Sequence, residues 1–110
     1  MKAKNPQISI IIPVLNEEKC IAKIIGFLKE NSYPKNIKEI IVVDGGSLDA
    51  TVEIASKLGV QTIQSSRGRA KQLNLGAKLA RGSVLYFLHV DTLPPKNFDE
   101  SILNAVQSGS

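Results

Sequence analysis

The sequence predicts a three-layer α/β fold, in which helices cover both faces of a parallel sheet. Short apolar runs alternate with segments of helical periodicity, so that strand–helix–strand recurs three times along the chain. The runs at residues 40–43 and 84–88 are apolar without alternation, which is typical of parallel strands buried on both faces. Helices that join such strands make right-handed crossovers.

Eight elements are expected from apolar periodicity and from the turn residues between the apolar runs. The first helix should bury one face, because its apolar residues follow the spacing i, i+3, i+4, i+7 at Ile21, Ile24, Ile25 and Leu28. The expected order is strand Ile8–Leu15, helix 17–31, strand Glu39–Asp44, helix Leu48–Leu58, strand Val60–Gln64, helix 69–81, strand Val84–Leu88 and helix 97–107.

The helix ends carry signals of their own. Ser47 or Asp49 is expected to cap the second helix, because short polar side chains accept the free N–H groups of a first turn. Gly59 and Gly82 are expected to end the second and third helices. The third helix should turn four small or apolar residues toward the sheet, namely Ala70, Leu73, Ala77 and Ala80.

Composition predicts one globular domain. Of 110 residues, 43% are hydrophobic and the formal charge is +4, which excludes a disordered chain. The single cysteine, Cys20, excludes an internal disulfide framework and a multi-cysteine metal site. The apolar run Ile8–Leu15 is too short to span a membrane and lacks the flanks of a secretory signal. We therefore expect a mildly basic cytoplasmic domain.

Candidate functional residues follow the predicted strands, since ligands of parallel sheets bind at the carboxyl ends of the strands. Asp44 and Asp91 stand at the tips of buried strands and not in obvious cap positions, so we expect a functional role for both. Glu17, Glu18 and Asp49 are explained equally well as residues that cap helices.

A basic segment points to an anion. Residues 54–90 hold six basic residues and no acidic one. Arg67 and Arg69 flank Gly68 directly before the third helix, where free N–H groups and the helix dipole attract negative charge. Gly68 would let the backbone approach that ligand closely. Carboxylates and cations at one edge suit a nucleoside diphosphate with a divalent metal.

Four segments, in order and at matching spacing, resemble the motifs of family 2 glycosyltransferases, which have the GT-A, Rossmann-like fold. They are Ser9–Glu18, Val42–Thr51, Arg67–Ala77 and Leu88–Thr92. The second is similar to V-D-D/G-G-S-x-D-x-T, and the fourth stands where the family carries its Asp-x-Asp metal motif. The Arg-Gly-Arg block, with a histidine in the metal motif, most resembles a bacterial subset that accompanies radical-SAM and selenium-domain proteins.

The resemblance implies transfer of a sugar from a nucleoside-diphosphate sugar, with a UDP-sugar favoured, to an unidentified acceptor. Asp44 would accept a hydrogen bond from the base, Glu17 would lie near the ribose or base, and Asp91 would hold Mn²⁺ or Mg²⁺ on the diphosphate. The nucleotide-binding residues that the resemblance implies are Pro13, Asn16, Glu17, Asp44, Gly46, Ser47, Arg67, Arg69 and His89.

Two departures from the family pattern matter. His89 replaces the first Asp of the metal motif, and imidazole is a poorer ligand for Mg²⁺ than for Mn²⁺. His89 would then bind the metal, bond the ribose or a phosphate, or pack. The general base of inverting members lies well downstream, whereas this sequence stops at Ser110 and Asp99 and Glu100 come too early to match it. Residues 1–110 are therefore expected to be a donor-binding half-domain without transfer activity of its own.

Three further expectations concern partners. The resemblance implies that the strand Val84–Leu88 pairs with the first strand. It would then expose an unpaired edge, so the chain should form a homo-oligomer or aggregate. The full-length enzyme would associate peripherally with the inner face of the membrane. No nucleic acid is expected as a partner.

Two rival functions stay open, a nucleotidyltransferase and a basic nucleic-acid-binding module. The first usually opens with a glycine-rich signature that this sequence lacks, and the second lacks interleaved aromatic residues around 67–81. A dinucleotide dehydrogenase is excluded, because Pro13–Glu17 replaces the required G-x-G-x-x-G. Ser47 is not in a G-x-S-x-G elbow, which excludes a hydrolase. Cys20 is expected to be a small core residue rather than the partner of His89.

Overall fold

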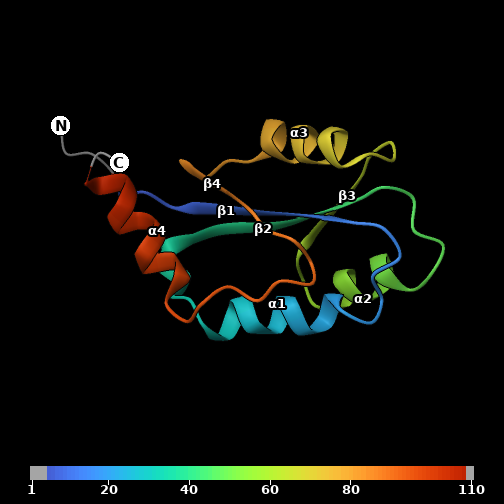
Figure 1. Cartoon of the computed structure of the whole chain (residues 1–110), viewed down its shortest axis with the longest axis horizontal. Helices are drawn as coiled ribbons and strands as arrows, with labels where there is room; N and C mark the ends of the chain where they lie inside the picture. Colours follow the sequence, from blue (N-terminus) through green and yellow to red (C-terminus); the bar gives the residue numbers. More distant parts are fainter. Residues whose placement is uncertain (1–4, 109–110) are drawn as a thin grey trace.

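A computed structural model describes residues 5–108 and contains one parallel sheet of four strands in the order β3-β2-β1-β4 (Figure 1). The predicted α/β class, with four strands and four helices, is confirmed. A short 3₁₀ turn before the second strand was not predicted. The elements are β1 (Ile8–Val14), α1 (Ile21–Glu30), η1 (Pro34–Asn36), β2 (Ile37–Asp44), α2 (Thr51–Lys57), β3 (Gln61–Gln64), α3 (Arg69–Leu79), β4 (Val84–Phe87) and α4 (Phe98–Gln107).

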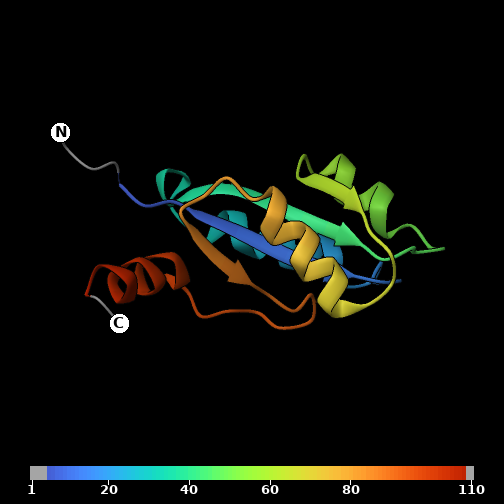
Figure 2. The same ribbon diagram turned by 90° about the horizontal axis from the view of Figure 1, so that it is seen from above.

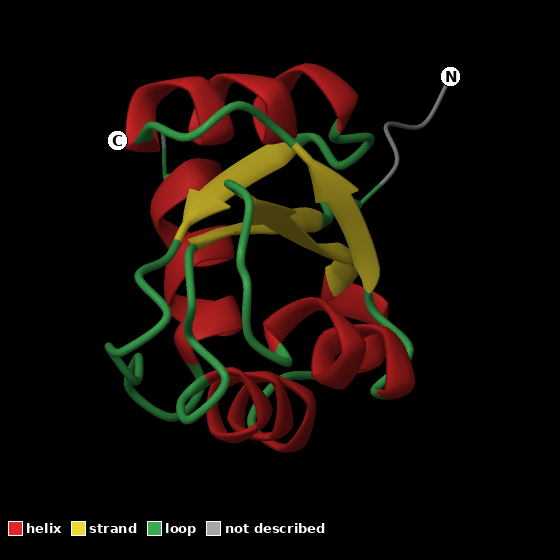
Figure 3. Cartoon of the chain, turned by 90° about the vertical axis from the view of Figure 1, so that its right-hand side faces the viewer, coloured by secondary structure: helices red, strands yellow, loops and turns green. Residues whose placement is uncertain are grey.

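Helices cover both faces of the sheet, as Figure 3 shows along the strands. α1 and α2 lie on one face, and all four apolar residues predicted for the buried face of α1 are buried. Phe98 of α4 stacks on Tyr86 of β4 with ring centroids 5.8 Å apart. The buried residues of this larger core are Ile8, Ile10, Ile12, Val14, Ile21, Ile24, Ile25, Leu28, Val42, Ala55, Leu88, Val90, Phe98 and Leu103.

Among the described residues, α3 is the helix that covers the other face, and it packs on β1 and β2 (Figure 2). Gly76 allows this close packing, because a Cβ there would lie 2.5 Å from Cγ2 of Ile11 and 3.1 Å from Cγ2 of Val43. A smaller core of Ile11, Ile41 and Val43 lies on this face. Three of the four residues predicted to face the sheet pack against it: Leu73, Ala77 and Ala80. The prediction for Ala70 was wrong, since Ala70 is exposed and Gln72 is buried in its place.

Two helices begin later than predicted. α1 begins at Ile21 and α2 at Thr51, because the residues before each helix bond across to the other loop. The Asp49 carboxylate accepts the N–H of Thr51 at 3.0 Å, as a cap would, although Ala50 stands directly before the helix. Ser47 is not the cap, because its hydroxyl donates to another carboxylate.

The prediction that β4 is buried on both faces was wrong. Its burial alternates, and Leu85 and Phe87 are 41% and 48% exposed. The cause is that α3 lies over β1 and β2 and leaves this face of β4 uncovered by the described residues (Figure 2). The predicted pairing of β4 beside β1 is confirmed, in the register Ile8 with Val84. Within residues 5–108, none of the helices has the length and apolarity needed to cross a membrane.

Candidate functional site

The loops after β1 and β2 lock together at the carboxyl edge of the sheet. The Asn16 N–H donates to Oγ of Ser47, and Oδ1 of Asn16 accepts the N–H of Leu48, both at 2.8 Å. Asn16 has a φ of 55°, a left-handed conformation that asparagine tolerates better than most residues. Asn16 and Ser47, both predicted site residues, therefore shape the rim by joining its two loops.

A second set of bonds extends this lock to the start of α2. The Glu17 N–H donates to Oγ1 of Thr51 at 2.7 Å, and the Glu18 N–H donates to Oδ2 of Asp49 at 3.3 Å. Oε1 of Glu18 accepts the N–H of Ala50 at 3.1 Å. The hydrogen bond from the Thr51 hydroxyl holds the pKa of Asp49 below its ordinary value. The backbone of Glu17 is thus fixed by its N–H.

Asp44 closes the turn that follows its own strand. Its Oδ2 accepts the N–H groups of Gly46 and Ser47 at 2.9 Å each, and its Oδ1 accepts the Ser47 hydroxyl at 2.5 Å. Gly46 has a φ of 107°, which favours glycine. Asp44 is only 1% exposed. The sequence had suggested no capping role for Asp44, and the turn supplies one; a contact with a nucleotide base stays a prediction.

A cavity of about 190 Å³ opens beside these loops. Predicted site residues from two separate segments line it: Pro13 and Glu17, at the end of β1 and in the loop after it, and Arg67 and Arg69, at the entry to α3. The cavity thus combines two guanidinium groups with one carboxylate, next to the N-terminus of a helix of 11 residues. Such a combination suits a ligand with both anionic and hydroxyl groups.

A smaller cavity of about 90 Å³ adjoins the first, since Pro13 and Arg69 line both. His89, after β4, lines it as well. An Arg69 guanidinium nitrogen lies 3.4 Å from Nδ1 of His89, and that Nδ1 lies 3.6 Å from Oδ1 of Asp91. Because a guanidinium only donates, Nδ1 accepts from Arg69 when the ring is neutral. The predicted phosphate and metal residues therefore form one row.

Asp91 ends this row and is open to solvent, with 68% of its side chain exposed. It also lines a third cavity of about 230 Å³, together with Lys19, Cys20 and Lys23. Within residues 5–108 no three His, Cys, Asp or Glu side chains come together as a metal cluster. The donor set of His89 and Asp91 fits a cation that takes its remaining ligands from phosphate oxygens and water. Cys20 is partly buried against the core, as expected.

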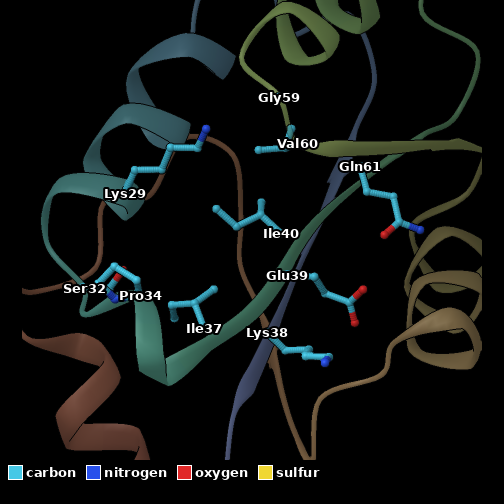
Figure 4. Close-up of a pocket in the computed structure, with 10 residues that line it drawn as sticks. All are labelled: Lys29, Ser32, Pro34, Ile37, Lys38, Glu39, Ile40, Gly59, Val60 and Gln61. Carbon is cyan, nitrogen blue, oxygen red and sulfur yellow. The ribbon is translucent and has the colours of Figure 1, made fainter.

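A larger cavity lies at the opposite end of the sheet (Figure 4). It measures about 580 Å³ and is lined by the starts of β2 and β3 and the end of α1, including Lys29, Ile37, Ile40 and Val60. None of the predicted site residues lines it. Ligands of parallel α/β sheets bind at the carboxyl ends of the strands. We therefore place the candidate site at the smaller cavities.

One buried polar residue of the site received no role from the sequence. Gln72 is 4% exposed and lines the same cavity as Arg67 and Arg69. Its Nε2 donates to the carbonyl oxygens of Val14 and Val43, at the ends of β1 and β2. The available signal was its position one turn before Gly76, on the face of α3 that approaches the sheet.

Comparison with known proteins decides the family. The sequence profile of Glycosyl transferase family 2 matches residues 9–110. The chain belongs to this family. It is 34% identical over 107 residues to Glycosyltransferase AglE of Haloferax volcanii, which covers 91% of the chain and 35% of AglE. The chain thus spans about a third of that relative's length. The resemblance seen in the four motifs is confirmed.

Solved structures agree with the family assignment. The chain superposes on Staphylococcus aureus TarS 1-349 in complex with UDP-GlcNAc with a TM-score of 0.81 and 27% identity, over 93% of this chain and 31% of that one. It superposes on the mannosyltransferase PcManGT of Pyrobaculum calidifontis, in complex with GDP-Man and Mn²⁺, with a TM-score of 0.77 and 25% identity. That match covers 94% of this chain and 32% of the other. The fold is therefore GT-A. The narrower likeness to members that accompany radical-SAM proteins stays a prediction.

Proposed function

We propose that this chain binds the nucleoside diphosphate of an activated sugar, with UDP favoured, as the donor-binding part of a glycosyltransferase. The observation that carries the proposal is the cavity lined by Glu17, Arg67 and Arg69, continuous with the row from Arg69 through His89 to Asp91. In this proposal the guanidinium groups bind the diphosphate. The Glu17 carboxylate serves the ribose or base, and the Asp91 carboxylate serves a metal. The nucleotide sugars bound to TarS and to PcManGT support the same class of donor.

Each residue has a task in this proposal. Arg67 and Arg69 bind the diphosphate, because guanidinium groups match phosphate oxygens in charge and geometry. Glu17 accepts a hydroxyl of the ribose, and Asp44 accepts from the base. Pro13 forms the wall shared by both cavities. Three other residues hold the rim in shape through the loop bonds described above: Asn16, Gly46 and Ser47.

A divalent metal completes the proposal. His89 and Asp91 would hold Mn²⁺ or Mg²⁺, and Mn²⁺ suits a donor set with imidazole better. When bound, the metal offsets the charge on the departing diphosphate. The Mn²⁺ present with PcManGT supports a divalent ion. His89 would meanwhile keep Arg69 near the same phosphates through the contact at Nδ1.

We propose further that residues 1–110 bind donor without transferring sugar. Asp99, the next carboxylate after the metal motif, is fully buried, and its Oδ2 accepts the Tyr33 N–H and the Asn36 amide at 2.9 Å each. It therefore braces α4 and is not placed to act as a base. A cytoplasmic location, at the inner face of the membrane for the full-length enzyme, belongs to the proposal.

Thermal shifts test the proposal with a panel of UDP, GDP and dTDP, each with and without Mn²⁺. We expect the largest stabilisation from UDP with Mn²⁺, because a ligand that binds only the folded chain stabilises it. Arg69→Gln should reduce this shift. The matched control Lys78→Gln, at the far end of α3, should not. Absence of any nucleotide shift, or an equal shift with random RNA, would overturn the proposal.

A further inference from the structure

Gln72 connects the end of the sheet with the loop that carries the two arginines. Its Nε2 donates to the carbonyl oxygen of Val14 at 2.9 Å and to that of Val43 at 2.8 Å. Its Oε1 accepts the N–H of Gly68 at 3.3 Å. The reversed amide would place oxygen against two carbonyl oxygens, so the hydrogen bonds fix its orientation. The side chain is thus satisfied by groups from three different segments.

Gly68 is held by Gln72 through two bonds. The Gln72 N–H donates to the Gly68 carbonyl at 2.9 Å, in addition to the side-chain bond to the Gly68 N–H. Gly68 has a φ of 136°, which favours glycine, and it stands directly before the first residue of α3. Because Gln72 occupies the Gly68 N–H, the free N–H groups offered to an anion begin at Arg69.

Gly45 is shaped to receive the same amide. A Cβ built on Gly45 would lie 2.8 Å from Oε1 of Gln72, and its three nearest neighbours would all be atoms of that side chain. Gly45 needs no left-handed φ, so space rather than backbone conformation requires a glycine there. Since Gly45 follows Asp44, the amide also borders the turn that Asp44 closes.

We infer that Gln72 is a positioning residue for diphosphate binding: it aligns Arg67 and Arg69 with the carboxyl ends of β1 and β2. The inference rests on the proposed function for the ligand, but the alignment is a property of the unliganded chain. Arg67 and Arg69 stand on either side of the residue that Gln72 holds. Without the amide, the loop would keep both charges and lose their fixed place.

The test compares Gln72→Met, a substitution of similar length without hydrogen bonds, with Ile25→Val in the core on the opposite face. Both lower stability, but only Gln72→Met should weaken binding of UDP and inorganic pyrophosphate, by about three- to tenfold. Amide hydrogen exchange of the free chain should accelerate at residues 66–69 in Gln72→Met and not in Ile25→Val. Equal affinities in both variants, with unchanged exchange at residues 66–69, would overturn the inference.

Gly45→Ala supplies a second variant in case Gln72→Met does not fold. As a single substitution, Gly45→Ala should weaken pyrophosphate binding. In the background of a further variant, Gln72→Ala, it should add no loss, because the side-chain atoms that its Cβ would meet are gone. An equal loss in both backgrounds would contradict a role through Gln72. Should the unmodified chain bind no diphosphate while the variants still accelerate exchange at residues 66–69, the proposed function fails and the positioning role stands.

Discussion

Glu39 in β2 holds Arg81, which lies 42 residues later in the connection between α3 and β4. Oε2 of Glu39 accepts the Arg81 N–H at 2.5 Å, and Oε1 lies 3.6 Å from the guanidinium Nε. The Ser9 hydroxyl donates to the same carboxylate at 2.6 Å and accepts the Gly82 N–H at 2.8 Å. A Cβ at Gly82 would lie 2.6 Å from Oγ of Ser9, so only glycine fits. These contacts of Ser9 and Glu39 with Arg81 and Gly82, here called the latch, hold the segment that leads into β4.

The latch predicts a loss of stability in acid. Burial raises the pKa of Glu39, but the bonds from the Arg81 N–H and the Ser9 hydroxyl, with the Arg81 charge, outweigh it and lower the pKa. A carboxylate whose pKa is lower in the folded chain stabilises that chain above the unfolded pKa, 4.5 for glutamate. This contribution is lost as pH falls through the folded pKa. Urea unfolding from pH 7 to pH 3 should show that decline.

Glu39→Gln should flatten this decline and cost about 1–3 kcal/mol at pH 7, since the side chain is only 6% exposed. The control Glu53→Gln removes an exposed pair with Lys57, 3.2 Å apart, and should change stability by less than about 1 kcal/mol. Parallel pH profiles for Glu39→Gln and the unmodified chain would show that the latch does not govern acid stability.

The exposed carboxylate of Asp91 leads us to expect that Mn²⁺ strengthens binding of UDP. Its side chain is 68% exposed and serves no core contact, so Asp91→Asn should leave the free energy of unfolding nearly unchanged. The same change should abolish the gain in UDP affinity that Mn²⁺ produces, because the carboxylate charge that attracts the cation is gone. Calorimetric titration with and without Mn²⁺ measures both. Equal UDP affinity with and without Mn²⁺ in the unmodified chain would refute the metal role.

Substitution of Asp44 should weaken recognition of the base and not of the diphosphate. A lost hydrogen bond to a charged group costs roughly 1.5–3 kcal/mol, so Asp44→Ala should weaken UDP binding by about one to two decades. Inorganic pyrophosphate has no base, and its affinity should barely change. Ser47→Ala removes the hydroxyl that bonds both Asp44 and the Asn16 N–H while keeping the carboxylate, so it measures the effect of loosening the loops without the loss of the Asp44 charge. A similar loss for UDP and pyrophosphate would assign Asp44 to the turn alone.

The sheet and the α1 face could be predicted because their signals are local. Periodicity alone places Ile21, Ile24, Ile25 and Leu28 on one face, and all four are buried. The late start of α2 could not be predicted in this way, because it depends on bonds such as that between Asn16 and Leu48, which are 32 residues apart. Side-chain bonds over such distances leave no periodic trace.

The candidate site divides along the same line. The location of the arginines and carboxylates at one edge of the sheet could be predicted, because polar residues that follow parallel apolar strands meet at that edge. The role of Gln72 could not be predicted, because a polar side chain on the inward face of a helix departs from apolar periodicity. Its partners are backbone carbonyl groups, which no residue type indicates. The exposure of Leu85 and Phe87 escaped because an apolar run does not tell which helices cover it.

The open face of β4 predicts self-association of the 110-residue chain. β4 is the last strand of the sheet on this side among the described residues, and its Leu85 is 41% exposed. Unpaired strand edges recruit further strands, and exposed apolar side chains favour the contact. Sedimentation equilibrium should therefore detect dimers or larger assemblies.

Leu85→Lys should shift the chain toward monomer, because a lysine on an edge strand opposes pairing. The control Leu48→Lys, at a residue 92% exposed in the loop after β2, should leave the assembly unchanged. A stable monomer at tens of micromolar, or equal effects of both lysines, would contradict association through this edge.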